Sequence, residues 1–148
     1  MKTIKNLVVL ADDDVDDREL FQDAVGCIDA DVNIVIFENG TKLMEYLNTP
    51  NATLPDILFL DINMPKKHGF DCLSEIRANE NLQTMCVIMF STSHGSYDVD
   101  KSYSLGADGY IQKPYTQSEM KRILKSTLDT DWKDPCAALH RHNFIIKA

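Results

Sequence analysis

Aspartates that follow short apolar runs are the residues of this 148-residue chain best suited to chemistry. Asp12 and Asp13 come directly after the run Leu7–Ala11, and Asp61 comes directly after the run Ile57–Leu60. Ligands bind beyond the carboxyl ends of the strands in open α/β sheets, so we expect these three carboxylates to converge on one edge. Carboxylates crowded into one crevice repel each other strongly without a cation. The pattern therefore predicts a metal site with oxygen ligands.

A small site of this kind favours Mg²⁺, which retains waters and typically meets one or two carboxylates together with phosphate oxygens. An ionised aspartate is also a nucleophile towards phosphorus and forms an aspartyl phosphate. The protein then has to position the donor and neutralise charge as the phosphoryl group moves. These residues therefore predict Mg²⁺-dependent phosphoryl transfer onto a carboxylate. Asp14 and Asp56 are interpreted differently, as a helix N-cap or a turn former.

Two further strand ends carry groups that suit a phosphoryl oxygen. Ser91 and Thr92 follow the run Cys86–Phe90, and either hydroxyl would donate a hydrogen bond to phosphate. Lys113 follows the run Gly109–Gln112, and its ammonium would add a positive charge to that of the metal ion. Its position at a strand end that faces the acidic crevice argues against a solvated surface lysine.

The elements that must position these residues alternate along the chain. Five apolar runs read as strands, and four of them are nearly continuous, as in a parallel sheet covered on both faces. The runs are Leu7–Ala11, Val32–Phe37, Ile57–Leu60, Cys86–Phe90 and Gly109–Gln112. Helical segments are expected between and after them, within 20–28, 43–47, 70–76, 98–105 and 120–128. The alternation predicts an α/β fold, a doubly wound parallel sheet with helices on both faces.

Composition and charge restrict the class of protein. The net charge of −8 argues against nucleic acid as a partner, because binding to phosphates needs a clustered basic surface. The first apolar run is too short for a signal peptide or a membrane span. The four cysteines contain no C-x-x-C pair and are interpreted as reduced thiols packed as small apolar residues. We therefore expect a cytoplasmic protein without a nucleic-acid or membrane partner.

Four stretches of the sequence together resemble the receiver domain of two-component response regulators. They are V-L-A-D-D-D-V-D-D, P-D-I-L-F-L-D-I-N-M-P-K-K-H-G, V-I-M-F-S-T-S and G-A-D-G-Y-I-Q-K-P. They occur in the family's order and span about residues 5–128. Two features narrow the resemblance to the small single-domain regulators that accompany bacteriophytochromes and hybrid sensor kinases, namely the loop Asn48–Pro55 and the motif S-T-S-x-x-x-x-D-V-x-x-S-Y-x-L-G-A-D-G-Y-I-x-K-P. The resemblance implies the flavodoxin-like strand order 2-1-3-4-5.

The resemblance also implies a role for each site residue. Asp61 is the phosphoacceptor, Lys113 pairs with the phosphate, and Ser91 and Tyr110 are the switch residues. The bond that precedes Pro114 is cis in the family, and we expect the same isomer here. The implied metal ligands are Asp12, Asp13 as the direct ligand of the acidic pair, Asp61 and the backbone carbonyl of Asn63.

A single-domain response regulator of a phosphorelay is the function that the resemblance implies. A sensor histidine kinase or phosphotransfer protein would phosphorylate Asp61, and the regulator would signal by a conformational change. The protein would act on itself rather than on a free substrate, catalysing its own phosphorylation and a slow dephosphorylation.

We expect a receiver domain over residues 1–129 and a C-terminal tail over 130–148. The tail is too apolar for an idle terminus, so we predict that it docks on its own domain or on a second copy. A homodimer would then form through the 96–128 face and the tail. The apolar tail residues are Trp132, Leu139, Phe144, Ile145 and Ile146.

Three alternatives stay open. A degenerate receiver would bind proteins without phosphorylation, although every chemical position here carries a competent residue. A phosphohydrolase of the haloacid-dehalogenase type would need a second acidic residue two positions after the nucleophile, where this chain has Asn63. A flavodoxin-like cofactor carrier would need a hydroxyl-rich or glycine-rich phosphate loop after the first strand, where this chain has the three aspartates 12–14.

Overall fold

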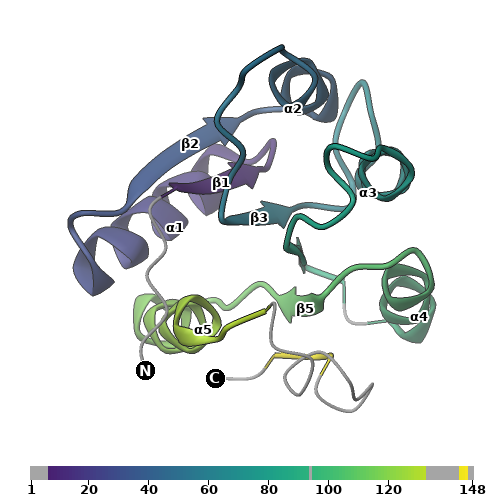
Figure 1. Ribbon diagram of the computed structural model, residues 1–148. Helices are drawn as coiled ribbons and strands as arrows, with labels where there is room; N and C mark the ends of the chain where they lie inside the picture. Colours follow the sequence, from purple (N-terminus) through teal and green to yellow (C-terminus); the bar gives the residue numbers. More distant parts are fainter. Residues whose placement is uncertain (1–6, 94, 133–143, 147–148) are drawn as a thin grey trace.

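The computed structural model describes residues 7–93, 95–132 and 144–146, in which strands and helices alternate (Figure 1). The strands are β1 (Leu7–Ala11), β2 (Asn33–Phe37), β3 (Ile57–Leu60), β4 (Val87–Ser91) and β5 (Gly109–Gln112). The helices are α1 (Val15–Ile28), α2 (Gly40–Leu47), α3 (Gly69–Ala78), α4 (Ser96–Ser104) and α5 (Gln117–Asp129). Each strand is therefore followed by a helix, as the alternating sequence pattern predicts.

The strands form one parallel sheet in the order β2-β1-β3-β4-β5. This order confirms the predicted doubly wound, flavodoxin-like fold. Strand β1 pairs with β2 on one side and with β3 on the other, so the strand order reverses at β1. Ligands of such sheets bind at this reversal, beyond the carboxyl ends of the strands.

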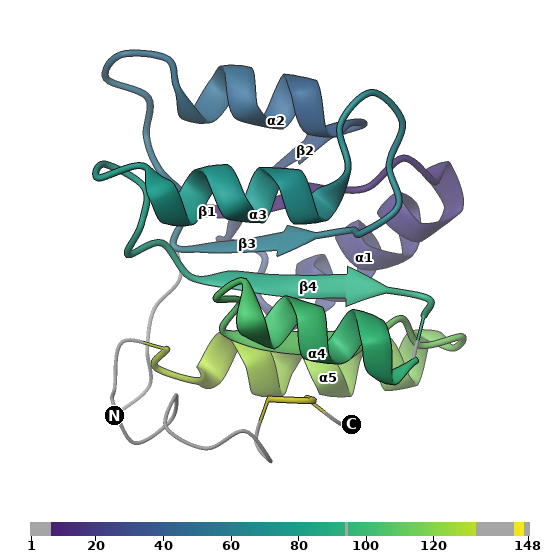
Figure 2. The ribbon, with the colours of Figure 1, turned by 90° about the vertical axis from the view of Figure 1, so that its right-hand side faces the viewer.

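Two apolar layers cover the sheet, one on each face. Val8 and Leu10 of β1 belong to the layer under α1 and α5, whereas Val9 and Ala11 belong to the layer under α2, α3 and α4. Figure 2 looks onto the face that α2, α3 and α4 cover. Every residue of β3 and β4 is buried, which explains why these runs are continuously apolar.

Side-chain caps set the beginnings of several helices. Asp14 is the N-cap of α1, where its carboxylate accepts hydrogen bonds from the backbone N–H groups of Asp16 and Asp17. This confirms the structural role predicted for Asp14.

Helix α4 has few apolar residues, and one of its buried residues is Ser102. The hydroxyl of Ser102 donates a hydrogen bond to the Asp98 carbonyl at 2.7 Å.

The prediction that the cysteines are free thiols packed in the core is confirmed for two of them. Cys72 and Cys86 are buried free thiols, but Cys27 is exposed, so its expected packing in the core is wrong. Cys27 lies in α1 outside the buried stripe that Phe21, Ala24 and Val25 form. Cys136 and Leu139 lie outside the described residues. Within the described ranges, no helix has the length and apolar character to cross a membrane.

Candidate functional site

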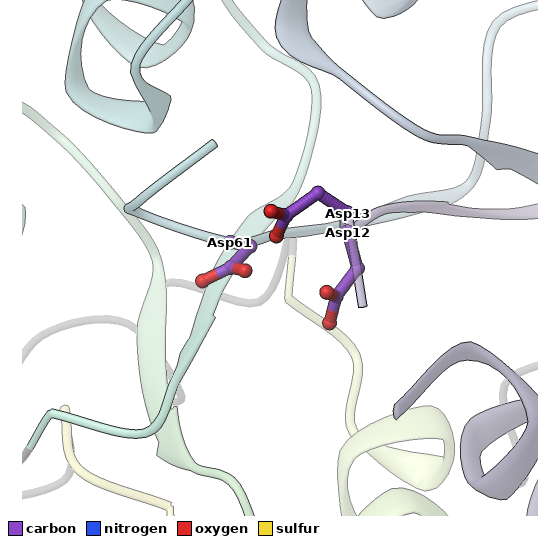
Figure 3. Close-up of side chains that lie close together, drawn as sticks. All are labelled: Asp12, Asp13 and Asp61. Carbon is purple, nitrogen blue, oxygen red and sulfur yellow. The ribbon is translucent and has the colours of Figure 1, made fainter. Parts of the chain in front are cut away.

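The carboxylates predicted to converge do lie together. One oxygen from each of Asp12, Asp13 and Asp61 lies within 4.8 Å of the other two (Figure 3). The register of the sheet explains this, because Ala11 pairs with Leu60 at the ends of β1 and β3. Asp12 and Asp61 are buried, whereas Asp13 is exposed at the mouth of the cluster.

Lys113 enters the same cluster from the end of β5. Its Nζ atom lies 2.8 Å from Asp12 Oδ2, 2.8 Å from Asp17 Oδ2 and 3.3 Å from Asp61 Oδ2. The residue is only 7% exposed. Its backbone N–H donates to the Ser91 carbonyl at 2.8 Å, which holds the end of β5 against β4. This geometry confirms that the lysine faces the acidic crevice and not the solvent.

The electrostatics of the cluster show a shortage of positive charge. Burial raises the pKa of Asp61 to about 7, and the Asp12 carboxylate adds to this rise, although Lys113 opposes it. Burial also raises the pKa of Asp12, and Lys113 only partly offsets that effect. Burial alone would lower the pKa of Lys113, but its carboxylate partners raise that pKa above its ordinary value. One ammonium therefore does not neutralise the carboxylates around it.

The arrangement suits a small divalent cation. Asp12 Oδ1 accepts a hydrogen bond from the Asp14 N–H at 3.0 Å. The buried Oδ2 atom of Asp12 has no hydrogen-bond donor among the described residues, although Lys113 pairs with it electrostatically. Buried oxygens normally have partners, and converging carboxylate oxygens are the preferred ligands of hard cations. The residues present thus fit the predicted metal site.

The backbone after Asp61 is fixed against the start of α3. The Gly69 N–H donates to the Ile62 carbonyl at 2.7 Å. A Cβ atom on Gly69 would lie 2.1 Å from the Asp61 carbonyl oxygen, so only glycine fits this approach. Asn63 is an exposed residue of the same loop, and the predicted metal contact of its carbonyl stays a prediction.

The hydroxyl candidates occupy different environments. Ser91 is buried at the end of β4, where its Oγ accepts a hydrogen bond from the Ser93 N–H at 3.2 Å, whereas Thr92 is exposed. Tyr110 is also buried, and its hydroxyl donates to the Ser93 carbonyl at 2.7 Å. Ser91 and Tyr110 are therefore linked through one short turn, whereas their switch roles stay predictions.

The expected isomer at Pro114 is wrong. Every peptide bond in the described part of the chain is trans, including the bond between Lys113 and Pro114. The trans isomer is the intrinsically preferred form of such bonds by about 0.5–1 kcal/mol. Lys113 reaches its carboxylate partners from this trans backbone.

Sequence reasoning missed Asp17 as a member of the cluster. An acidic residue in the first turn of a helix is usually explained by the helix dipole, and Asp17 has that position in α1. Its distance from Asp13 is four residues, about one helical turn, and this spacing is the signal that points back to the carboxyl edge of the sheet.

The residues 144–146 lie along the outer edge of β5. Ile145 forms a parallel bridge with Tyr110. The Tyr110 N–H donates to the Phe144 carbonyl, and the Ile146 N–H donates to the Tyr110 carbonyl, both at 2.9 Å. The buried Phe144 ring lies 6.4 Å from the Tyr110 ring and 5.3 Å from the Tyr103 ring. This segment thus contacts β5 and α4, next to one of the predicted switch residues.

Comparisons with known proteins agree with the sequence motifs and the fold. The profile of the family described as "Response regulator receiver domain" matches residues 8–125. Response regulator Rcp1 from Synechocystis sp. is 28% identical over 130 residues, which cover 85% of this chain and 88% of Rcp1. Chemotaxis protein CheY1 from Helicobacter pylori is 31% identical over 94 residues, which cover 64% of this chain and 74% of CheY1.

Solved structures of response regulators are also similar to this chain. The phosphorylated cyanobacterial phytochrome response regulator RcpA matches with a TM-score of 0.77 and 31% identity, over 84% of this chain and 91% of RcpA. The Mn²⁺-bound form of Rcp1 matches with a TM-score of 0.74 and 28% identity, over 82% of this chain and 90% of Rcp1.

Proposed function

The chain belongs to the response regulator receiver domain family, and we propose that it accepts a phosphoryl group on Asp61 in a Mg²⁺-dependent reaction. The observation that carries this proposal is the convergence of Asp12, Asp13, Asp61 and Lys113 in one crevice at the carboxyl edge of the sheet. The cluster supplies a carboxylate nucleophile, oxygen ligands and a cation, which phosphoryl transfer requires.

An Asp61 carboxylate oxygen would attack phosphorus while the bond from phosphorus to the donor breaks, so the donor leaves with that electron pair. The donor is a phosphohistidine of a sensor kinase or of a phosphotransfer protein, and the bond that breaks joins phosphorus to its imidazole nitrogen. Lys113 and the Ser91 hydroxyl would bind the equatorial oxygens. Mg²⁺, held by Asp12, Asp13, Asp61 and the Asn63 carbonyl, would neutralise charge on the same oxygens. Slow hydrolysis of the aspartyl phosphate would return the protein to its resting state.

Incubation with acetyl phosphate and Mg²⁺ tests the proposal by intact-protein mass spectrometry. The parent protein should gain the mass of one phosphoryl group, and chelation of the metal should prevent this gain. Asp13→Asn should abolish the gain while the circular dichroism spectrum stays that of a folded protein. A parent that gains no mass would support the alternative of a phosphorylation-independent binding module.

Signal output would use the surface formed by α4, β5 and α5. A phosphoryl group on Asp61 would draw the Ser91 hydroxyl inward, and the Tyr110 ring would respond. The shared contact of both residues with Ser93 supports this coupling. Beryllofluoride, a phosphoryl mimic, should therefore change the NMR signals of the Tyr110 ring, and unchanged signals would contradict a switch role.

We also propose that the tail segment covers the outer edge of β5 and contributes to this output surface. Its hydrogen bonds with Tyr110 and the burial of Phe144 support docking on the chain's own domain. Docking on a second copy is the other outcome, and light scattering with and without beryllofluoride separates the two. A constant monomer mass favours docking within one chain, whereas a mass that doubles favours a dimer.

A cytoplasmic location and the lack of a nucleic-acid partner are part of the same proposal. The net charge of −8 supports the second point, because nucleic acid binding relies on clustered positive charge.

A further inference from the structure

Asp17 is the carboxylate of the cluster for which neither the sequence motifs nor the proposed transfer reaction gives a role. It lies in the first turn of α1, and its side chain is 30% exposed. Its Oδ2 atom accepts a hydrogen bond from Lys113 Nζ at 2.8 Å. Asp61 accepts from the same nitrogen at 3.3 Å. The lysine is therefore held more closely by α1 than by the residue proposed to carry the phosphoryl group.

An ammonium group has three N–H donors and no acceptor. Lys113 already faces three carboxylates in the resting cluster, those of Asp12, Asp17 and Asp61. A phosphoryl group on Asp61 brings roughly two negative charges and oxygens that accept strongly. One of the existing contacts must then weaken, because three carboxylate oxygens already lie within 3.3 Å of the lysine nitrogen and the new oxygens must approach the same ammonium. Asp17 is the partner outside the proposed metal ligands, and its partial exposure lets water replace the lysine there.

We propose that Asp17 is a positioning residue that holds Lys113 on the α1 side of the crevice and competes with the phosphoryl group for the lysine ammonium. This inference rests on the proposed function of Asp61. It follows that Asp17 weakens the binding of a phosphoryl group, both by occupying the cation and by placing a further negative charge beside the site.

Asp16 provides a matched control for charge. It lies in the same turn of α1 and carries the same charge, but it is exposed and is not one of the three carboxylates paired with Lys113. A general effect of charge near the helix terminus would change Asp16→Asn and Asp17→Asn alike. An effect exerted through the lysine contact would appear in Asp17→Asn alone.

The experiment measures beryllofluoride binding to the full chain in the presence of Mg²⁺, by the shifts of backbone amide signals in NMR titrations. Asp17→Asn should bind about five-fold more tightly than the parent, the effect of one unit charge a few ångströms away in a wet site. Asp16→Asn should stay within about two-fold of the parent, because an exposed charge is strongly screened. Asp17→Glu keeps the charge and the contact, so it should restore an affinity close to that of the parent.

Equal affinities for Asp17→Asn and Asp16→Asn, or weaker binding by Asp17→Asn, would overturn the proposed role of Asp17 alone. A parent that binds no beryllofluoride would overturn the function of Asp61 and this inference with it. Thermal unfolding of each variant without beryllofluoride checks that the fold is intact. A second readout is the lifetime of the phosphorylated protein after acetyl phosphate is removed, which should lengthen in Asp17→Asn and stay unchanged in Asp16→Asn.

Discussion

Strand β5 joins two clusters of charged side chains that differ in the balance of positive and negative charge. Lys113 follows its carboxyl end and faces three carboxylates. Asp108 precedes its amino end and pairs with one cation, Arg77 of α3, at 2.9 Å. The first cluster has more anions than one lysine can neutralise, whereas the second is matched one to one.

The guanidinium of Arg77 donates hydrogen bonds to backbone carbonyl groups as well as to the Asp108 carboxylate. It donates to Asp108, to the Gly106 carbonyl at 2.8 Å and to the Met85 carbonyl at 2.6 Å. Asp108 in turn accepts a hydrogen bond from the Val87 N–H at 2.9 Å. The amino ends of β4 and β5 and the end of α3 are thereby tied together.

The difference separates a cluster whose charges are matched from one in which negative charge is in excess. Burial raises the pKa of both Asp108 and Asp61, but only around Asp108 do hydrogen bonds and a matched cation complete the environment. Uncompensated buried charge is a common property of functional sites. Substitutions at the Lys113 cluster should therefore alter chemistry, and substitutions at the Arg77 cluster should alter stability.

The largest expected effect is on chemistry. Asp61→Asn should remove the acid-labile, hydroxylamine-sensitive adduct completely, because the amide is not a competent nucleophile. Mass spectrometry after treatment with acetyl phosphate and Mg²⁺ measures this. An acid-stable adduct that persists in the variant would instead identify a hydroxyl such as that of Ser91 as the acceptor.

Arg77→Met should lower the free energy of unfolding by about 2 kcal/mol, because it leaves the half-buried Asp108 carboxylate without its cation. Chemical denaturation measures this loss. Phosphorylation of the folded fraction should continue. Lys42→Met is the matched control, since the Lys42–Glu38 pair is exposed on the surface and should contribute less than about 1 kcal/mol. Similar losses in the two variants would remove the distinction between the half-buried pair and the exposed pair.

The stability of the protein should depend on pH through Asp61. Burial raises the pKa of Asp61 from its ordinary value of 3.8 to about 7 in the folded protein, so the folded form favours the protonated group. The contribution of Asp61 to the free energy of unfolding is fully present below about pH 4 and is lost as the pH rises through about 7. Asp61→Asn should therefore be more stable than the parent at pH 8 by about 1–2 kcal/mol, and equally stable near pH 4.

Thermal or urea unfolding in the presence of a chelator at the two pH values measures this difference. Addition of Mg²⁺ should reduce the advantage of Asp61→Asn at pH 8, because the cation compensates the carboxylates of the parent. An equal difference in stability at both pH values would show that folding does not raise the pKa of Asp61.

The smallest expected effect concerns the middle of β5. Phe144→Ala should lower the free energy of unfolding by about 1 kcal/mol, because the 4% exposed ring packs on Tyr110 and Tyr103. Ile145→Ala is the control, since Ile145 is 42% exposed and should change stability little. Phosphorylation by acetyl phosphate should proceed in both variants. Equal stability of the two would exclude Phe144 as a packed cover of β5.

The sequence predicts much of the fold and the centre of the site because both depend on local patterns. Buried parallel strands are continuously apolar, and Asp61 and Lys113 each follow such a strand directly. Asp17 escaped prediction because its partner is 96 residues away, and its local pattern has a sufficient explanation in the helix dipole. Arg77 binds carbonyl groups of distant loops, which no sequence spacing indicates.

Residues 144–146 pair with Tyr110 at what would otherwise be an open edge of the sheet. Strand β5 is the last strand of the sheet, and an open edge strand offers unpaired N–H and C=O groups as a template for another chain. Both backbone groups of Tyr110 that point outward from the sheet are already hydrogen-bonded to this segment. Residues 144–146 thus occupy the backbone groups of Tyr110 through which another chain could otherwise pair with this edge of the sheet.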